Sequence, residues 1–294
     1  MAIRIGANPI GWSNDDLRSL GGETPLETCL AEAKQAGFAG MELGHKFPRE
    51  PKALKAVLDR HGLDLVSGWY SMALLEHDVD AEWAVIQEHK NLLQALGARV
   101  LIVAETSNAI HGDRSMPLSR RPHMTERQWP LFTDRLGRLA QRLRNEGMQL
   151  VYHHHMGTVI ESGEEVHRLM DMTPEPMHLL LDTGHLTFAG ADPAEFASIY
   201  RDRISHVHAK DVRLTVMGDV KARDKSFLDA VVDGVYTVPG DGMVDYDSVF
   251  ACLEGYDGWV VVEAEQDPAK ANPLTYAKLG YDNLSRFLRD AKLI

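Results

Sequence analysis

Side chains of the kinds that bind divalent metal ions recur at the ends of four successive apolar segments. The segments are MQLVYHHH, MHLLLDTGH, ISHVHAKD and WVVVEAE. Their metal-binding residues are His153 and His155, Asp182, His206 and His208, and Glu263 and Glu265. Imidazole and carboxylate groups together favour manganese, cobalt or iron rather than the metals that thiolates bind. These segment ends therefore predict a divalent metal site, provided that the fold brings them together.

The spacing of the paired residues supports this interpretation. If the segments are strands, side chains two residues apart point to one face, so His153 and His155 share a face and His154 points the other way. The histidine and glutamate pairs of the third and fourth segments have the same spacing. We expect one member of each pair to lie deeper than the other.

Each of these residues also has an ordinary structural interpretation. A single inward histidine is more often a core residue than a ligand, and Asp182 could simply cap the next helix. Glu263 directly follows WVVV, so we expect a buried carboxylate that needs a partner or a cation. Four such residues on successive segments are explained better by one shared metal ion than by four unrelated structural roles.

Other residues at predicted strand ends are candidates for contacts with a substrate. Trp69 could form one wall of a sugar pocket, or pack ordinarily at a rim. Glu105 and His185 lie where substrate contacts are expected. Glu42 could reach the substrate or form a structural ion pair.

Lys210 shares a face with His208, two residues before it. It could donate a hydrogen bond to an oxyanion, or serve as the partner of Asp182 or Asp211.

Short apolar segments alternate with amphipathic helical patterns along the whole chain. The predicted strands cover residues 3–8, 40–44, 63–69, 100–106, 148–155, 177–185, 204–211 and 259–265. Because each is followed by a helical pattern, we expect parallel pairing with helices that cover the sheet.

Local signals mark several helix ends. Thr24 can cap a helix in which Pro25 is the first residue and Glu27 completes a capping box, and Gly37 can end it. Other helices are predicted over residues 50–61, 80–96 and 125–146, and from Ser162 and Asn272 onward. Residues 107–124 and 212–244 are predicted to be long loops, and such loops often form lids or subunit contacts.

Eight strand–helix units at this length predict one (β/α)8 TIM barrel spanning residues 1–294. The alternative is an open doubly wound sheet, but GANPIGW after the first strand is not the GxGxxG of such folds. VPGDGMVDY, residues 238–246, lacks the lysine of a phosphate-binding loop and is interpreted as a turn. In a TIM barrel the active site lies at the carboxyl ends of the strands, where the metal-binding residues fall.

The composition excludes several classes of partner. The chain has 294 residues and a formal charge of −12, which disfavours nucleic acid or an anionic membrane as a partner. No apolar run approaches the roughly 20 residues of a membrane span, and MAIRIGANPIGW does not look like a signal peptide. Cys29 and Cys252 belong to no CxxC motif. We therefore expect a cytoplasmic protein.

The segments LLLDTGH, HVHAKD and GWVVVEAE resemble the xylose-isomerase-like barrel superfamily of sugar isomerases, epimerases and dehydratases. The resemblance implies one divalent metal ion held by Asp182, His208 and Glu263. The superfamily commonly places a glutamate on the fifth strand as a further ligand. Histidine stands there in this chain, so the resemblance implies His153 or, as the alternative, His155.

A finer combination of segments is similar to the inosose dehydratase family of inositol catabolism. It comprises YHHHMGT, LLLDTGHLTFAG, SFLDAVVDGVYTVPGDG and VVEAEQDPAKANPL. The similarity implies dehydration of scyllo-inosose to a trihydroxycyclohexane-1,2-dione, with manganese or cobalt and with glutathione as cofactors. It also implies a homo-oligomer, either a dimer or a tetramer.

This chemistry needs a base for the proton next to the ketone and an acid for the departing hydroxyl. His155 and Glu265, which should flank the metal, are the predicted pair, and Lys210 is a further candidate acid. The closest alternative is a ketose epimerase or sugar isomerase using the same metal site. A metal-dependent nuclease is disfavoured by the charge, and a non-catalytic sugar sensor by the absence of a recognisable signalling module.

Overall fold

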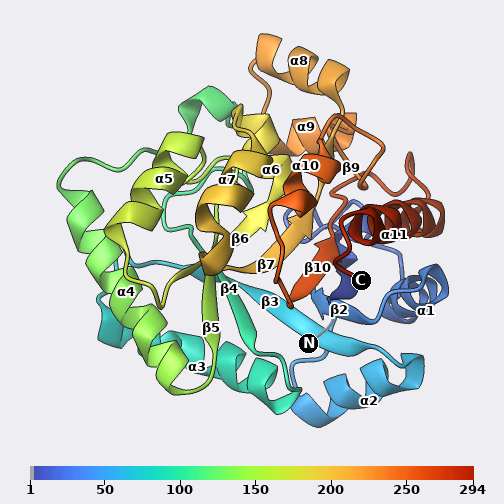
Figure 1. Ribbon diagram of the computed structural model, residues 1–294, viewed down its shortest axis with the longest axis horizontal. Helices are drawn as coiled ribbons and strands as arrows, with labels where there is room; N and C mark the ends of the chain where they lie inside the picture. The colour runs from blue at the N-terminus through green and yellow to red at the C-terminus, as the bar shows by residue number, and fades with distance from the viewer. Residues whose placement is uncertain (1–2) are drawn as a thin grey trace.

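The computed structural model describes residues 3–294 and has a closed barrel of eight parallel strands at its centre (Figure 1). The strands are β1 (Arg4–Ala7), β2 (Gly40–Leu43), β3 (Asp64–Met72), β4 (Val100–Glu105), β5 (Gln149–His153), β6 (His178–Asp182), β7 (Ile204–Ala209) and β10 (Trp259–Val262). Each pairs with its neighbour in the chain, and β10 closes the barrel by pairing with β1. The predicted (β/α)8 barrel is thus confirmed, and the open sheet is excluded.

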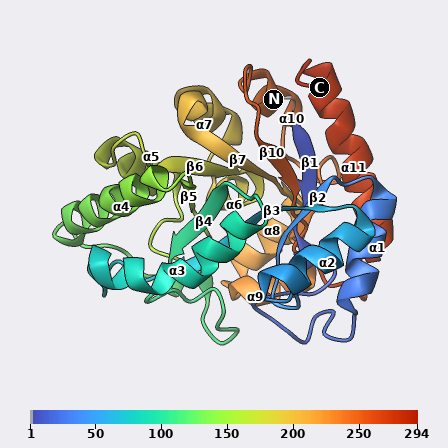
Figure 2. The same cartoon turned by 90° about the horizontal axis from the view of Figure 1, so that it is seen from below.

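Helices surround the barrel, as the two perpendicular views show (Figures 1 and 2). The outer helices are α1 (Leu26–Ala36), α2 (Pro51–His61), α3 (Val79–Ala95), α4 (Gln128–Asn145), α5 (Gly163–Met172), α7 (Pro193–Tyr200), α10 (Tyr246–Ala251) and α11 (Pro273–Asp290). Among residues 3–294, no helix combines the length and apolar character that crossing a membrane requires.

Most helix ends follow the predicted local signals. Gly37 and Gly62 end α1 and α2 with φ of 111° and 60°, which glycine adopts without steric cost. Ser162 and Glu165 form a complete capping box at the start of α5. The predicted cap by Thr24 is wrong. Pro25, with extended backbone, precedes α1, and no side chain caps that helix.

The segment predicted as a long loop after the seventh strand is largely structured. It contains β8 (Asp211–Val212), α8 (Leu214–Ala222), α9 (Phe227–Asp233) and β9 (Tyr236–Thr237). These elements bury a small apolar cluster of their own. The other predicted loop, residues 107–124, contains only the short helix η2 (Leu118–Arg120).

The interior of the barrel is filled below the strand ends. Ile102, Val151 and Leu180 form a separate apolar cluster, apart from the core between strands and helices. Val151 and Leu180 lie two residues before His153 and Asp182 on β5 and β6, so each pair shares a face. The candidate metal ligands therefore lie directly above an apolar floor.

The barrel strands end one to three residues away from the predicted positions. Trp69 lies within β3, which continues to Met72, rather than at its end. β5 ends at His153 and β10 at Val262, so His155, Glu263 and Glu265 lie just beyond strands.

Candidate metal centre and active site

The four predicted ligands converge above the apolar floor. His153 Nε2 lies 3.1 Å from Asp182 Oδ2, and His208 Nδ1 lies 3.6 Å from the same oxygen. Asp182 and His208 are direct neighbours in the register of β6 and β7. Glu263 Oε2 touches His208 Nδ1 from the side of β10. All four side chains are buried. Ligand atoms of His153, Asp182 and His208 lie within 4.8 Å of one another, as do those of Asp182, Glu263 and the neighbouring His185.

The position of His208 suits it to bind a metal ion. Its Nε2 lies 3.1 Å from Glu42 Oε1, so Nε2–H donates to that carboxylate and Nδ1 is the nitrogen that faces Asp182 and Glu263. Although burial opposes it, the carboxylates of Glu263 and Glu42 raise the pKa of His208 well above its usual value. A cation bound between these groups would take the place of the proton that the carboxylates favour on Nδ1. Two imidazoles and two carboxylates fit manganese or cobalt.

Glu42 is the anchor of the histidines on β7. Its carboxylate also accepts hydrogen bonds from His206 Nε2, Asn8 Nδ2 and Ser67 Oγ, at 2.8, 2.7 and 2.6 Å. Burial alone would raise the pKa of Glu42, but His208 and His206 hold it well below its usual range. His206 is thus the deeper member of its pair and contacts Glu42 rather than the ligand cluster.

Asp182 caps a helix with one carboxylate oxygen and faces the ligand cluster with the other. Its Oδ1 accepts a hydrogen bond from the backbone N–H of His185, 2.8 Å away, and so caps the short helix α6 (Thr183–Ala189). Its other oxygen, Oδ2, faces His153 and His208.

Lys210 is fully buried beside the ligand cluster. Its Nζ lies 2.6 Å from Glu263 Oε1, 3.5 Å from Glu265 Oε2 and 3.0 Å from His185 Nε2. Gly184 makes room for it, since a Cβ there would lie 2.5 Å from the Lys210 side chain. Despite burial, His208 and Lys210 lower the pKa of Glu263 to about 2. Lys210 therefore fixes the charge and position of the carboxylates.

Asp211 is not the partner of Lys210. Its carboxylate accepts hydrogen bonds from the backbone N–H groups of Gly240, Gly242 and Val244. These bonds shape the turn that was predicted over residues 238–246.

His155 and Glu265 lie beside the ligand cluster, as expected for the second members of their pairs. Nδ1 of His155 lies 2.8 Å from the backbone oxygen of Met156, so Nδ1–H donates and Nε2 remains an acceptor. Glu265 accepts a hydrogen bond from Asn14 Nδ2 at 3.2 Å. Burial raises the pKa of Glu265 to about 8. Ligand atoms of His155, Glu265 and the underlying His185 lie within 4.8 Å of one another.

A cavity of about 620 Å³ opens above these residues. His153, His208 and Glu263 line it together with His155 and Glu265.

The structure distinguishes the three predicted substrate contacts. Trp69 lines the cavity, with its ring centroid 5.3 Å from that of His153. Glu105 does not line it, because its carboxylate is bound by Ser107 and the backbone N–H of Leu75. His185 also lies below the surface of the cavity, with its ring centroid 4.0 Å from that of His155.

His154 points away from the cavity, as the alternation along the strand predicts. Its ring stacks on that of His153, with centroids 6.0 Å apart, and is fully buried. Burial lowers the pKa of His154 to about 3, so its ring is neutral.

Sequence reasoning missed several residues of the cavity. Asn8, Asp15, Asp16 and His111 line it from loops that follow β1 and β4. Their positions after barrel strands were the available signal, since such loops form the active-site face of a TIM barrel.

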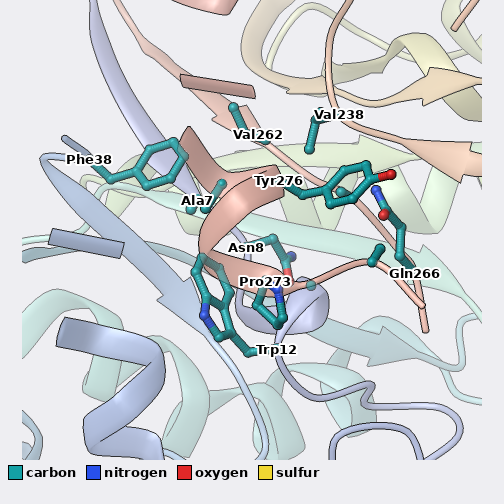
Figure 3. A pocket seen from close by; sticks show the side chains of 13 residues that line it. Ala7, Asn8, Trp12, Phe38, Val238, Val262, Gln266, Pro273 and Tyr276 are labelled. Atoms are coloured by element: carbon teal, nitrogen blue, oxygen red, sulfur yellow. The ribbon is translucent and has the colours of Figure 1, made fainter. Parts of the chain in front are cut away.

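A second cavity, of about 340 Å³, lies between β1, β10 and α11 and is chiefly apolar (Figure 3). Phe38, Val238 and Val262 form its walls, and Gln266 and Tyr276 lie at one side. Asn8 lines both cavities.

Comparisons with known proteins agree with this fold. A model of the xylose isomerase-like TIM barrel family matches residues 30–290. The rhizopine catabolism protein MocC of Rhizobium meliloti is 51% identical over 288 residues, covering 97% of this chain and 89% of that protein. The inosose dehydratase of Geobacillus thermodenitrificans is 46% identical over 279 residues, covering 94% of each chain.

Solved structures share the fold at lower sequence identity. A xylose isomerase domain protein from Alicyclobacillus acidocaldarius has a TM-score of 0.67 and 21% identity, covering 99% of this chain and 100% of its own. The probable 3-DHS dehydratase AsbF from Bacillus anthracis has a TM-score of 0.69 and 14% identity, covering 96% and 99%. With the family model and the closely similar relatives, the barrel shows that this chain belongs to the xylose isomerase-like TIM barrel family.

Proposed function

We propose that this chain is a metal-dependent inosose dehydratase. It would convert scyllo-inosose to a trihydroxycyclohexane-1,2-dione by forming an enediolate and releasing the β-hydroxyl as water. Relatives named inosose dehydratase are 43–46% identical over 94% of the chain. The observation that carries the proposal is the cluster of His153, Asp182, His208 and Glu263, with His155 and Glu265 beside it.

The four residues of the cluster would hold the metal ion, and manganese or cobalt is the proposed metal. When bound, such an ion polarises a ketone and stabilises the negative charge that develops as the neighbouring proton leaves. Glutathione is proposed as a further cofactor on the family resemblance alone. The predicted homo-oligomer stays a prediction that light scattering can check.

His155 is the proposed base. Because its Nδ1–H is held by the Met156 backbone oxygen, the lone pair on Nε2 is free to accept the proton next to the ketone. Trp69 stands beside its ring, with centroids 5.7 Å apart, and would limit how the substrate ring tilts. A well-placed base of this kind accelerates a reaction by roughly 10²–10⁴-fold.

The stereochemistry of the substrate supports a pairing of His155 with Glu265. In scyllo-inosose all neighbouring hydroxyls are trans, so the α-hydrogen and the hydroxyl on the next carbon lie on one face of the ring. Base and acid must then also lie on one side. His155 and Glu265 meet this condition, with ligand atoms within 4.8 Å of each other. Glu265 would give its proton to the departing hydroxyl, and Lys210 would hold the resulting carboxylate.

The decisive test combines metal analysis with product analysis. Protein loaded with manganese or cobalt is incubated with scyllo-inosose, and the product is identified by mass spectrometry. A dicarbonyl product lighter by one water supports the dehydratase. A product of unchanged mass would instead indicate an epimerase or isomerase, and tight binding without turnover would indicate a sensor.

A further inference from the structure

Two loops meet over the mouth of the metal-site cavity. The loop after β1 carries Asp16 and the loop after β4 carries His111, and both side chains line the cavity. His111 Nε2 lies 3.8 Å from Asp16 Oδ1, which is longer than a hydrogen bond. An oxygen atom about 2.8 Å from each of them fits this spacing. The two side chains are therefore placed to bind one hydroxyl group between them.

The loop that carries Asp16 is fixed to the active site. Asn14, which is fully buried, accepts hydrogen bonds through Oδ1 from the backbone N–H groups of Asp16 and Leu17, at 2.8 and 2.6 Å. Its Nδ2 donates to Glu265 at 3.2 Å. One amide side chain thus sets the position of Asp16 relative to the proposed acid.

The loop that carries His111 is fixed on the opposite side. The backbone N–H of Ile110 donates to the carbonyl oxygen of Gly157, 2.9 Å away. Gly157 has a φ of 77°, and a Cβ there would lie 2.9 Å from the backbone nitrogen of His111. The His111 ring centroid lies 5.0 Å from that of His155. His111 is therefore held next to the proposed base.

The charge of the cavity indicates what kind of group this pair receives. Asp15, Asp16, Glu42, Glu263 and Glu265 line the cavity, and no lysine or arginine is among the described residues that do so. Phosphate or carboxylate groups are usually bound by such cations. The rim thus favours an uncharged hydroxyl over an anionic substituent.

We propose that Asp16 and His111 bind the ring hydroxyl on the carbon opposite the ketone and so restrict the enzyme to uncharged, highly hydroxylated rings. The inference rests on the proposed function, in which the ketone end of the ring lies at the metal site. The far edge of the ring then faces the two loops. The Asp16 carboxylate accepts the hydroxyl proton, and the imidazole of His111 contacts the same oxygen.

The test compares scyllo-inosose with the analogue that lacks the hydroxyl opposite the ketone. For the wild type, we expect the loss of this hydroxyl to lower kcat/KM by about 10-fold or more, as for a hydrogen bond to a charged group. Asp16→Ala and His111→Ala should lower kcat/KM on scyllo-inosose by a similar factor, chiefly through KM. On the analogue these variants should lose little further, because the contact is already missing.

A matched control is His123→Ala. His123 lies on the same long loop, its side chain is 62% exposed, and its partner is Glu165 outside the cavity. This variant should behave as the wild type on both substrates. Melting temperature and metal content, measured for all variants, show whether the fold and the metal site are retained.

Two outcomes would overturn the inference. One is unchanged kinetics of folded Asp16 and His111 variants on scyllo-inosose. The other is a folded variant in which the loss of the substrate hydroxyl lowers kcat/KM by as large a factor as it does in the wild type. The mutation and the loss of the hydroxyl would then act independently. If the wild type turns over neither compound, the proposed function fails instead. The same comparison is then made by calorimetric binding to manganese-loaded protein, where additivity would again refute the pair.

Discussion

Glu42 Oε1 lies 3.1 Å from His208 Nε2 and thereby determines which nitrogen of that imidazole faces the candidate metal site. The two residues come from β2 and β7, more than 160 positions apart in the chain. Ligand orientation in this barrel therefore depends on a carboxylate that does not itself belong to the ligand cluster.

Replacing Glu42 by glutamine should weaken metal binding. The amide cannot serve His206 and His208 as a shared anionic acceptor, so Nδ1 of His208 becomes a poorer ligand. Loss of such a supporting partner typically costs 10–100-fold in metal affinity. Titration of the metal-free variant with manganese measures this loss. An unchanged affinity in a folded variant would show that Glu42 does not orient His208.

The two oxygens of Asp182 can be separated by mutation. Asp182→Asn should abolish metal binding and turnover, because the anionic ligand is lost, while the amide oxygen can still cap α6. Asp182→Ala removes the cap as well, at a cost of about 1 kcal/mol in the free energy of unfolding. Metal analysis and chemical denaturation of both variants check this. Retained metal with normal turnover in Asp182→Asn would contradict the ligand set.

Removal of the proposed base should affect chemistry and not metal binding. His155→Gln should lower kcat by roughly 10²–10⁴-fold and leave the metal content unchanged. Exchange of the α-hydrogen of scyllo-inosose with deuterated water, followed by NMR, should fall by the same factor. His123→Gln is the control on a neighbouring loop. If exchange continued at the wild-type rate, another residue would have to be the base.

Glu161 gives a prediction about stability and pH. Burial, the largest influence, raises the pKa of Glu161 from 4.5 to about 7. The folded protein therefore binds this proton more tightly than the unfolded chain. The resulting stabilisation is fully present below pH 4.5 and is lost as the pH rises toward 7.

Glu161→Gln should remove this dependence. The variant keeps an oxygen that can accept the hydrogen bond from the backbone N–H of Gly157. Its melting temperature should fall less than that of the wild type between pH 5 and pH 8. Glu165→Gln changes a carboxyl group whose pKa is lowered, so it should not flatten the dependence of melting temperature on pH. If the melting temperatures of the wild type and Glu161→Gln changed with pH in parallel, Glu161 would not be the source of this pH dependence.

The barrel and the convergence of its candidate ligands could be predicted from sequence for a physical reason. Parallel strands each followed by a helix place their carboxyl ends on one rim, so His153, Asp182, His208 and Glu263 had to approach one another. Because side chains alternate between the two faces of a strand, His154 could be predicted to point away from the face that His153 and His155 share. The small shifts of the strand ends did not change which candidate ligands converge, because the order of residues along each strand was retained.

The contribution of the loops to the cavity could not be predicted in the same way. The loops of Asp16 and His111 are held by particular hydrogen bonds, which the backbone N–H of Asp16 donates to Asn14 and that of Ile110 donates to Gly157. Such contacts produce no periodic pattern in the sequence. The short helix α9 was missed because seven residues are too few for a clear helical pattern. Thr24 failed as a cap because the extended residue before α1 is Pro25, which has no side-chain acceptor.

The apolar cluster of Ile102, Val151 and Leu180 lies below the candidate ligands, so we expect the metal ion and the substrate to enter from the side of the strand ends. The substrate, bound above the metal ion on this side, would then cover the ion. We therefore expect the proposed metal ion to bind before the proposed substrate, and the bound substrate to slow the removal of the ion by a chelator.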